Sequence, residues 1–156
     1  MKKIILTALI FLFFGIWYAF DPTPWRILTT YFALIPFLGT VILVLVQYIF
    51  MAKTVTRDVL YAAISIYLLL GAIFVPIYGF VETLWPGSFI DGAMPDRSVT
   101  WQQFIYYSYV TLTTMGYGDM LPISWWARSI ASMEAVIGVL YLAIMMARLV
   151  GLYAHE

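Results

Sequence analysis

Four long apolar stretches constrain this chain more than any other feature of its sequence. They are residues 4–20, 31–51, 59–80 and 129–147. A helix needs about 20 apolar residues to cross the hydrocarbon core of a bilayer, and each stretch reaches or approaches that length. Because 64% of the residues are hydrophobic and only 10% are charged, an ordinary soluble domain is excluded. The sequence predicts an all-α integral membrane protein with four transmembrane helices.

The first apolar stretch has a second interpretation. It is slightly short and follows Lys2 and Lys3, which also fits a cleaved signal peptide. However, its end contains the bulky residues Trp17 and Phe20, whereas signal peptidase prefers small residues. We therefore expect a retained span, so that residues 1–57 form two N-terminal transmembrane helices. The sequence assigns no role to this pair.

The distribution of charge predicts how the chain lies in the membrane. The formal net charge is zero, so no basic patch indicates nucleic acid as a partner, and the expected surroundings are a lipid bilayer. Lys and Arg in short flanks favour the cytoplasmic side. With the N-terminus inside, that side holds Lys2, Lys3, Lys53, Arg57 and Arg148, against Arg26, Arg97 and Arg128 outside. We therefore expect a multi-pass protein of the cell membrane with both termini cytoplasmic.

A shorter apolar segment, residues 100–112, follows the third stretch after a polar region, residues 81–99. Thirteen helical residues rise about 20 Å, so a helix entering from outside ends near the midplane of the bilayer. An extended segment can then return to the surface, provided that protein or water surrounds it. This is a re-entrant hairpin. The alternative is an interfacial helix anchored by Tyr106, Tyr107 and Tyr109.

The residues that follow this helix, 113–119, have glycine at alternate positions, Gly116 and Gly118. In an ordinary strand, successive carbonyls point to opposite sides. Glycine adopts left-handed backbone angles at little steric cost, so alternate glycines allow successive carbonyls to turn the same way. Several chains that each contribute such a segment form stacked rings of oxygens, which replace the hydration shell of K⁺. The alternative is an external Gly-rich turn between two helices.

The same segment carries a family signature. The pattern T-x-x-T-x-G-Y-G-D is matched by Thr111, Thr114, Gly116, Tyr117, Gly118 and Asp119. With this match, residues 58–156 resemble the pore domain of potassium channels. The resemblance implies a potassium-selective homotetramer with a tetrameric pore. Its expected parts are an outer helix at 59–80, a turret at 81–99, a pore helix at 100–112, a filter at 113–119 and an inner helix at 128–153.

The resemblance also implies roles for single residues. The expected K⁺ ligands are the backbone carbonyls of Thr114, Met115, Gly116 and Tyr117 and the hydroxyl of Thr114, while Gly118 completes the ion-binding segment and shapes its outer mouth. Support of the filter is expected from Thr111, Thr113, Asp119, Tyr106, Tyr107 and Glu134. Met115 departs from the valine or isoleucine usual in the family. Its flexible side chain packs less rigidly than a β-branched one, which affects filter stability.

The last apolar stretch contains three features with two interpretations each. Glu134 is the only acidic residue within a predicted span, and we favour a structural hydrogen bond to the pore helix over a proton sensor. Gly138 fits a gating hinge by resemblance, and close helix packing equally well. Val139, Leu142 and Met146 share a helical face that lines a cavity or packs against lipid or core.

Missing features narrow the function. Cysteine is absent, and we find no catalytic dyad, metal cluster or nucleotide loop, so we expect neither an enzyme nor a cofactor, with K⁺ as the permeant ion. The first two spans lack a voltage sensor's repeated arginines. Because few residues follow the last span, we expect no cytoplasmic ligand-binding domain. Two alternatives stay open: a weakly selective cation channel, permitted by Met115, and a non-conducting regulatory membrane subunit.

Overall fold

The computed structural model describes residues 2–20, 23–94 and 97–153. Within these residues the elements are α1 (Lys2–Phe20), α2 (Pro24–Met51), α3 (Arg57–Leu84), β1 (Phe89–Asp91), α4 (Trp101–Leu112), β2 (Met120–Pro122) and α5 (Trp125–Tyr153). The chain ends that we predict to be cytoplasmic, residues 1 and 154–156, lie outside the described residues. Residues 95 and 96 of the predicted turret lie outside them too.

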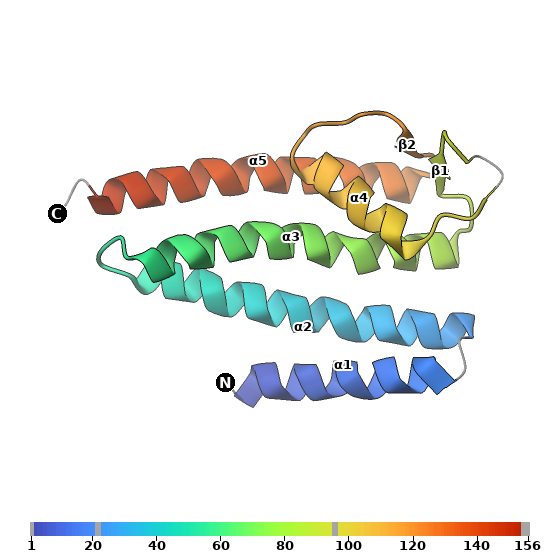
Figure 1. Cartoon of the computed structure of the whole chain (residues 1–156), viewed down its shortest axis with the longest axis horizontal. Helices are drawn as coiled ribbons and strands as arrows, with labels where there is room; N and C mark the ends of the chain where they lie inside the picture. Colours follow the sequence, from blue (N-terminus) through green and yellow to red (C-terminus); the bar gives the residue numbers. More distant parts are fainter. Residues whose placement is uncertain (1, 21–22, 95–96, 154–156) are drawn as a thin grey trace.

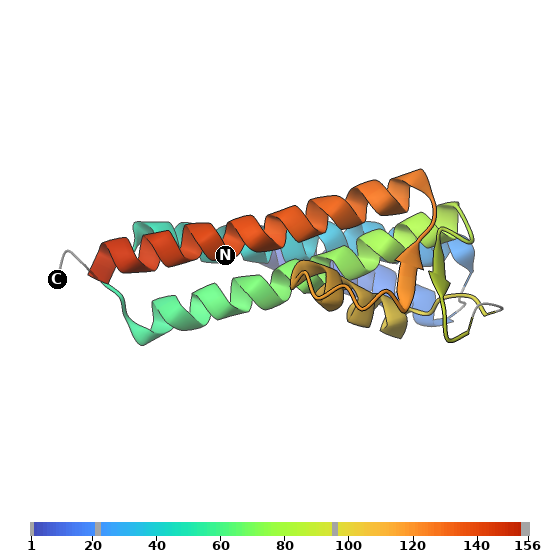
Figure 2. The same cartoon turned by 90° about the horizontal axis from the view of Figure 1, so that it is seen from above.

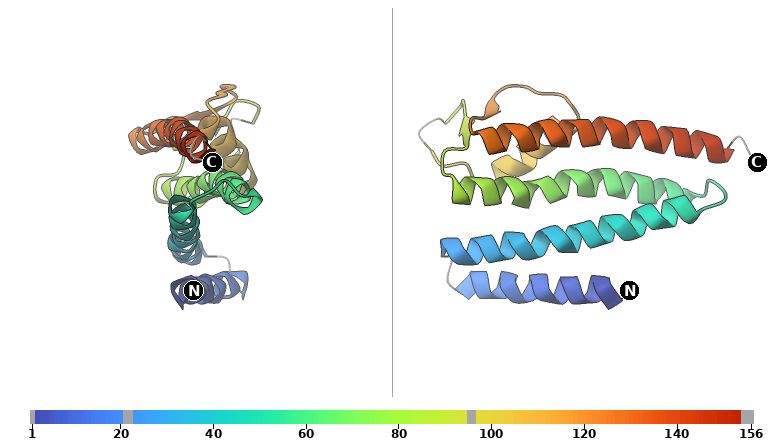
Figure 3. Two further views of the ribbon diagram at one scale, coloured as in Figure 1. Left: turned by 90° about the vertical axis from the view of Figure 1, so that its left-hand side faces the viewer. Right: turned by 180° about the vertical axis from the view of Figure 1, so that it is seen from behind.

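The long helices form a row. Helices α1 to α3 run antiparallel and pack side by side, and α5 packs on α3 (Figure 1). Viewed end-on, the row widens where α4 packs against both α3 and α5 (Figure 3). Helix α4 and both strands lie at one end of the molecule, and α5 finishes at the opposite end (Figure 2).

Three helices are long and apolar enough to cross a membrane among the residues that the structure describes. They comprise Trp25–Met51, Arg57–Leu84 and Trp125–Leu152. The apolar part of α1, Ile4–Phe20, is shorter. It packs on α2, where Phe11 and Phe37 stack with ring centroids 5.9 Å apart. The chain is thus a helical membrane protein with three helices of full spanning length, where the sequence predicts four spans.

Local sequence explains where the helices begin. Pro24 stands in the first turn of α2, where its missing N–H costs no hydrogen bond. The Thr56 hydroxyl accepts a hydrogen bond from Val59 N at 3.4 Å and caps α3. Before α4, Gln103 Oε1 accepts from Thr100 N at 2.8 Å, the return half of a capping box. These caps satisfy backbone donors that no helical carbonyl reaches.

A small antiparallel sheet was not predicted. β1 pairs with β2 so that Ile90 faces Leu121. Beyond the strands, Gly92 N donates to Asp119 O at 2.7 Å, and Ile123 N donates to the carbonyl of Ser88 at 2.7 Å. The sheet therefore joins the predicted turret to the residues directly after the predicted filter.

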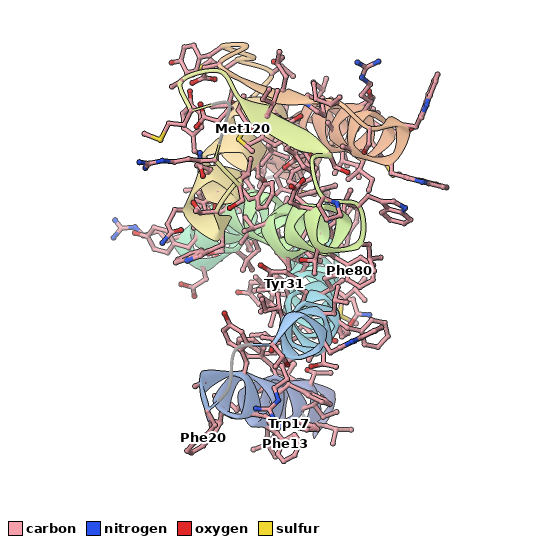
Figure 4. The ribbon with its side chains drawn as sticks, turned by 90° about the vertical axis from the view of Figure 1, so that its right-hand side faces the viewer. Phe13, Trp17, Phe20, Tyr31, Phe80 and Met120 are labelled. Atoms are coloured by element: carbon pink, nitrogen blue, oxygen red, sulfur yellow. The ribbon has the colours of Figure 1, made fainter. Side chains whose placement is uncertain are left out.

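Two buried clusters hold the row together. Near the sheet, the hydroxyphenyl ring of Tyr78 makes edge-on contacts with Phe89 and Tyr107 at 5.2 and 5.1 Å between centroids. At the other end, a second cluster joins α2, α3 and α5 and contains Ile49, Val59, Ala62, Ala63, Ile66 and Met145. By contrast, Phe13, Trp17 and Phe20 are exposed on α1, the edge of the row farthest from Met120 (Figure 4). Exposed apolar side chains of this kind suit contact with lipid.

Tyrosine rings from two neighbouring helices pack against glycines of α3. The ring of Tyr31, from α2, fills the space beside Gly79, where an added Cβ would lie 2.7 Å from the ring. The ring of Tyr109, from α4, fills the space beside Gly71, where a Cβ would lie 2.4 Å away. Glycine at these positions lets the neighbouring helices approach closely.

Candidate functional site

The backbone of the predicted filter alternates in handedness. Thr114, Gly116 and Gly118 have φ angles of +56°, +54° and +78°. The two glycines adopt the left-handed conformation that the sequence predicts, whereas Thr114 was not expected to do so. It is the only non-glycine residue with positive φ in the described part of the chain, and a β-branched residue is strained there. Left-handed angles at every second residue turn successive carbonyls toward one side.

The inner end of this segment is fixed to the last turn of α4. Thr114 N donates to Thr111 O at 2.9 Å, and Met115 N donates to Val110 O at 3.0 Å. The Thr113 hydroxyl donates to a carbonyl of the same helix at 2.7 Å. These bonds hold the start of the segment against the last turn of α4. Thr111 itself is half-buried on α4.

The predicted ion ligands lie at the surface of the single chain. Residues 113–119 are all exposed, with 56% of Met115 and 65% of Tyr117 accessible. At the predicted depth in the bilayer, backbone without internal hydrogen bonds needs protein or water around it. One chain therefore presents an open segment rather than a closed site.

The two tyrosines expected to brace the filter lie in different surroundings. The Tyr106 hydroxyl donates to Asp119 Oδ2 at 2.6 Å, and its ring stacks on Tyr117 with centroids 6.5 Å apart. The ring of Tyr107 instead lies buried against Tyr78. Tyr106 thus contacts both the filter tyrosine and the outer aspartate, and Tyr107 belongs to the core behind them.

If residues 113–119 conduct ions as the sequence predicts, Tyr106→Phe is expected to accelerate the loss of current during sustained conduction, because it removes the bond that holds Asp119. The effect is expected to be roughly twofold to fivefold in rate, since the bond is solvent-exposed. Recordings from planar bilayers measure the decay. Tyr61→Phe, the same change at an exposed residue near the start of α3, is the control. Equal decay rates in both variants would show that the bond does not hold the outer mouth.

Asp91, at the end of β1 in the predicted turret, is bonded to the start of α4. Its carboxylate accepts hydrogen bonds from Ala93 N at 2.9 Å and from Gln103 Nε2 at 2.5 Å. These bonds lower the pKa of Asp91 below its usual value, the backbone bond from Ala93 most strongly. The carboxylate therefore stays ionised and keeps the start of α4 attached to the end of β1.

Glu134 lies at the junction of three helices. Its side chain is completely buried. Oε1 accepts a hydrogen bond from the Ser108 hydroxyl of α4 at 2.5 Å, and Oε2 accepts one from the Tyr78 hydroxyl of α3. The Ser108 hydroxyl also lies 2.7 Å from the carbonyl of Gly71. The predicted contact with the pore helix is thus made through Ser108, which joins α5 to α4 and α3.

Sequence reasoning missed Ser108 and Tyr78 as partners of Glu134. Ser108 is a small polar residue among the aromatic residues of α4, which was the available signal. Nothing in the sequence distinguishes Tyr78 from the other tyrosines, because its role depends on how α3 and α5 pack.

Gly138 lies where α5 meets the end of α4. A Cβ added there would lie 2.3 Å from Leu112 O and 3.1 Å from its Cδ1. Close packing alone therefore requires glycine at this position. Val139, Leu142 and Met146 follow on α5 and are exposed in the single chain.

Gly138→Ala is expected to lower the free energy of unfolding in detergent by about 1–3 kcal/mol, because the methyl group collides with backbone atoms. Gly151→Ala in the same helix is the control, since no heavy atom lies within 4 Å of its added Cβ. Thermal unfolding measures both variants. A Gly138 variant that keeps its stability but changes gating would favour the hinge interpretation instead.

A family model described as an ion channel matches residues 59–154, which include all of α4 and both strands. The chain is also 40% identical over 60 residues to the potassium channel protein kcv of Paramecium bursaria Chlorella virus 1. That match covers 36% of this chain and 60% of the viral protein's length. No solved structure matches the chain. The predicted relation to the pore domain of potassium channels is confirmed by the first two matches.

Proposed function

The chain belongs to the ion channel family, and from this premise we propose that it conducts K⁺ passively through a pore formed by four identical chains. Conduction is downhill and needs no cofactor. The carbonyls of Thr114, Met115, Gly116 and Tyr117 bind the ion, together with the Thr114 hydroxyl. Gly118 and Asp119 form the outer mouth.

One observation carries this proposal: the alternating left-handed backbone at residues 114, 116 and 118. An external loop has no need of such a pattern, and at Thr114 it is costly. A conducting filter needs it, because each ring of oxygens must replace part of the hydration shell of K⁺.

The same geometry supports a pore formed by several copies of the chain, for which we propose four. A single segment lies on one side of an ion and cannot surround it. The exposed residues of the filter and of α5, Val139, Leu142 and Met146 among them, then face the axis or a neighbouring copy. Helix α4, with 12 residues, rises about 18 Å and is re-entrant. Its C-terminal end directs partial negative charge at the membrane centre, where a cation is otherwise costly to hold.

In this proposal α1 is a fourth, shorter span. Its 19 residues rise about 28 Å, which is close to the thickness of the hydrocarbon core. The loop between α2 and α3 carries Lys53 and faces the cytoplasm, together with the first turn of α3 at Arg57. Both termini then lie on the cytoplasmic side.

Met115 supports a second candidate, a weakly selective cation channel. Its side chain is exposed in the single chain and is more flexible than a β-branched residue. A filter backed by this side chain holds its oxygens less rigidly, and that weakens discrimination between K⁺ and Na⁺.

Flux from purified protein in liposomes tests the proposal, combined with native mass spectrometry. We expect K⁺ flux, a reversal potential near the K⁺ equilibrium value in mixed K⁺ and Na⁺, and the mass of four chains. A reversal potential near zero would favour the weakly selective channel. Absence of flux from correctly assembled protein would favour the non-conducting regulatory subunit.

A further inference from the structure

Arg148 connects the end of α5 to the end of α2. Its Nη2 donates hydrogen bonds to Phe50 O at 3.0 Å and to Ala52 O at 2.9 Å. The guanidinium Cζ also lies 5.7 Å from the centroid of the Phe50 ring. Because α2 packs mainly on α3, this contact gives the α1–α2 pair a direct connection to the inner helix.

The chemistry of this contact suits arginine in particular. The last carbonyls of a helix have no partner within the helix and carry partial negative charge. A guanidinium group is planar and donates several hydrogen bonds in fixed directions, whereas an ammonium group does not. Arg148 is half-buried: its Nε is enclosed and has no hydrogen-bond partner in the described part of the chain, while Nη2 donates to the two carbonyls. A charged donor shared by two carbonyls resists displacement.

Residues near Arg148 also hold the C-terminal half of α5 against α3 and α2. The Tyr141 hydroxyl donates to Ala63 O at 2.5 Å, and its ring stacks on Tyr67 of α3 at 5.8 Å between centroids. Met145 is buried in the cluster that contains Ile49 of α2. The C-terminal half of α5 is therefore packed on the start of α3 and bonded through Arg148 to the end of α2.

The contact between Arg148 and the end of α2 lies away from the filter. In Figure 1 the segment between α4 and β2 runs along the edge of the molecule opposite α1, so α2 lies farther from it than α3 and α5 do. In the proposed tetramer the pore axis passes along the filter, so α2 is peripheral. A bond from α5 to α2 therefore draws the cytoplasmic half of α5 away from the axis.

We propose that the α1–α2 pair positions the inner helix and that Arg148 is the residue through which it acts. By holding α5 outward, Arg148 favours a wide cytoplasmic entrance, whose lining includes Leu142 and Met146. This inference rests on the proposed function and adds a role for residues 1–57. Arg148 is a positioning residue, since it touches neither the ion nor the filter.

Single-channel recording of Arg148→Gln tests the proposal. We expect the open probability to fall about tenfold, because a charge-assisted hydrogen bond is worth roughly that factor. Unitary conductance and the K⁺ to Na⁺ permeability ratio are expected to stay unchanged. Arg148→Lys keeps the positive charge but not the planar guanidinium group. Its open probability is therefore expected to lie between those of Arg148→Gln and the wild type. Arg57→Gln removes a charge near the same membrane surface, at an exposed residue, and is expected to match the wild type.

A second variant keeps the test decisive if Arg148→Gln fails to assemble. Phe50→Ala removes the ring beneath the guanidinium but leaves the backbone carbonyl, at a half-exposed position that tolerates change. We expect a smaller fall in open probability than in Arg148→Gln, and a further fall when Arg148→Lys is added, because the two carbonyls that the guanidinium binds are still present. Met51→Ala, at the exposed neighbouring residue, is its control.

The outcomes separate this inference from the proposed function. Unchanged or increased open probability in both the Arg148 and Phe50 variants would overturn the inference while K⁺ flux persists. An equal fall in Arg57→Gln would also overturn it, because surface charge would then explain the effect. Absence of K⁺ flux from the wild-type protein would overturn the proposed function itself.

Discussion

Gly116→Ala is expected to abolish K⁺ flux while the protein still assembles. Gly116 has a φ of +54°, and a residue with a Cβ costs about 1–2 kcal/mol in the left-handed region. No heavy atom lies within 4 Å of the added Cβ in the single chain, so the effect comes from the backbone. Around one pore the strain is repeated in every copy, and we expect flux to fall at least about a hundredfold. K⁺ efflux from liposomes measures the loss, and native mass checks assembly.

Gly87→Ala is the matched control for this prediction. Gly87 also has a positive φ, +82°, and also has no heavy atom within 4 Å of an added Cβ. It lies after α3, outside the filter, so its substitution applies the same kind of strain at a different place. We expect Gly87→Ala to conduct. If both variants lose flux together, misfolding rather than carbonyl geometry explains the result, and if neither does, the filter assignment is wrong.

Glu134→Ala is expected to lower the free energy of unfolding in detergent by about 3–5 kcal/mol, because it leaves a cavity and removes the acceptor of the Tyr78 hydroxyl. The Ser108 hydroxyl also loses Glu134 but can still donate to Gly71 O. Glu134→Gln keeps the volume and can still accept from Tyr78, so we expect stability within about 1 kcal/mol of the wild type. Thermal unfolding in one detergent compares all variants.

The glutamine variant also separates the two interpretations of Glu134. A structural role predicts that Glu134→Gln conducts with the same dependence on pH as the wild type. A proton sensor predicts that the dependence disappears, because glutamine does not titrate. Met133→Ala, at the exposed neighbouring position, is the control for an effect of the helix itself and is expected to alter neither property.

The sequence indicated the helical membrane fold and the related family because both depend on local patterns. Apolar runs of sufficient length form helices in lipid wherever they occur, and alternate glycines permit a left-handed backbone without help from neighbours. The same reasoning placed Glu134 in contact with the pore helix, since a buried carboxyl group needs a hydrogen-bond partner. Ser108 supplies that contact.

What the sequence could not indicate depends on contacts between distant segments. Strands β1 and β2 have three residues each and show no alternating pattern, so only their pairing defines them. Tyr106 and Tyr107 are adjacent and identical, yet one contacts Asp119 and the other the core, because successive residues of α4 face different directions. Arg148 was predicted to lie at a membrane surface, but its bond with Ala52 crosses 96 positions of the chain.

The two tyrosines that press on α3 have a further consequence for how the molecule changes shape. Tyr31 and Tyr109 each occupy the space beside a glycine, Gly79 and Gly71, from different helices. Rotation of α3 about its long axis would bring a residue with a side chain against one of these two rings. The packing therefore opposes such a rotation. We expect it to remain a stationary frame during opening and closing, with the motion confined to α5 and to the segment after α4.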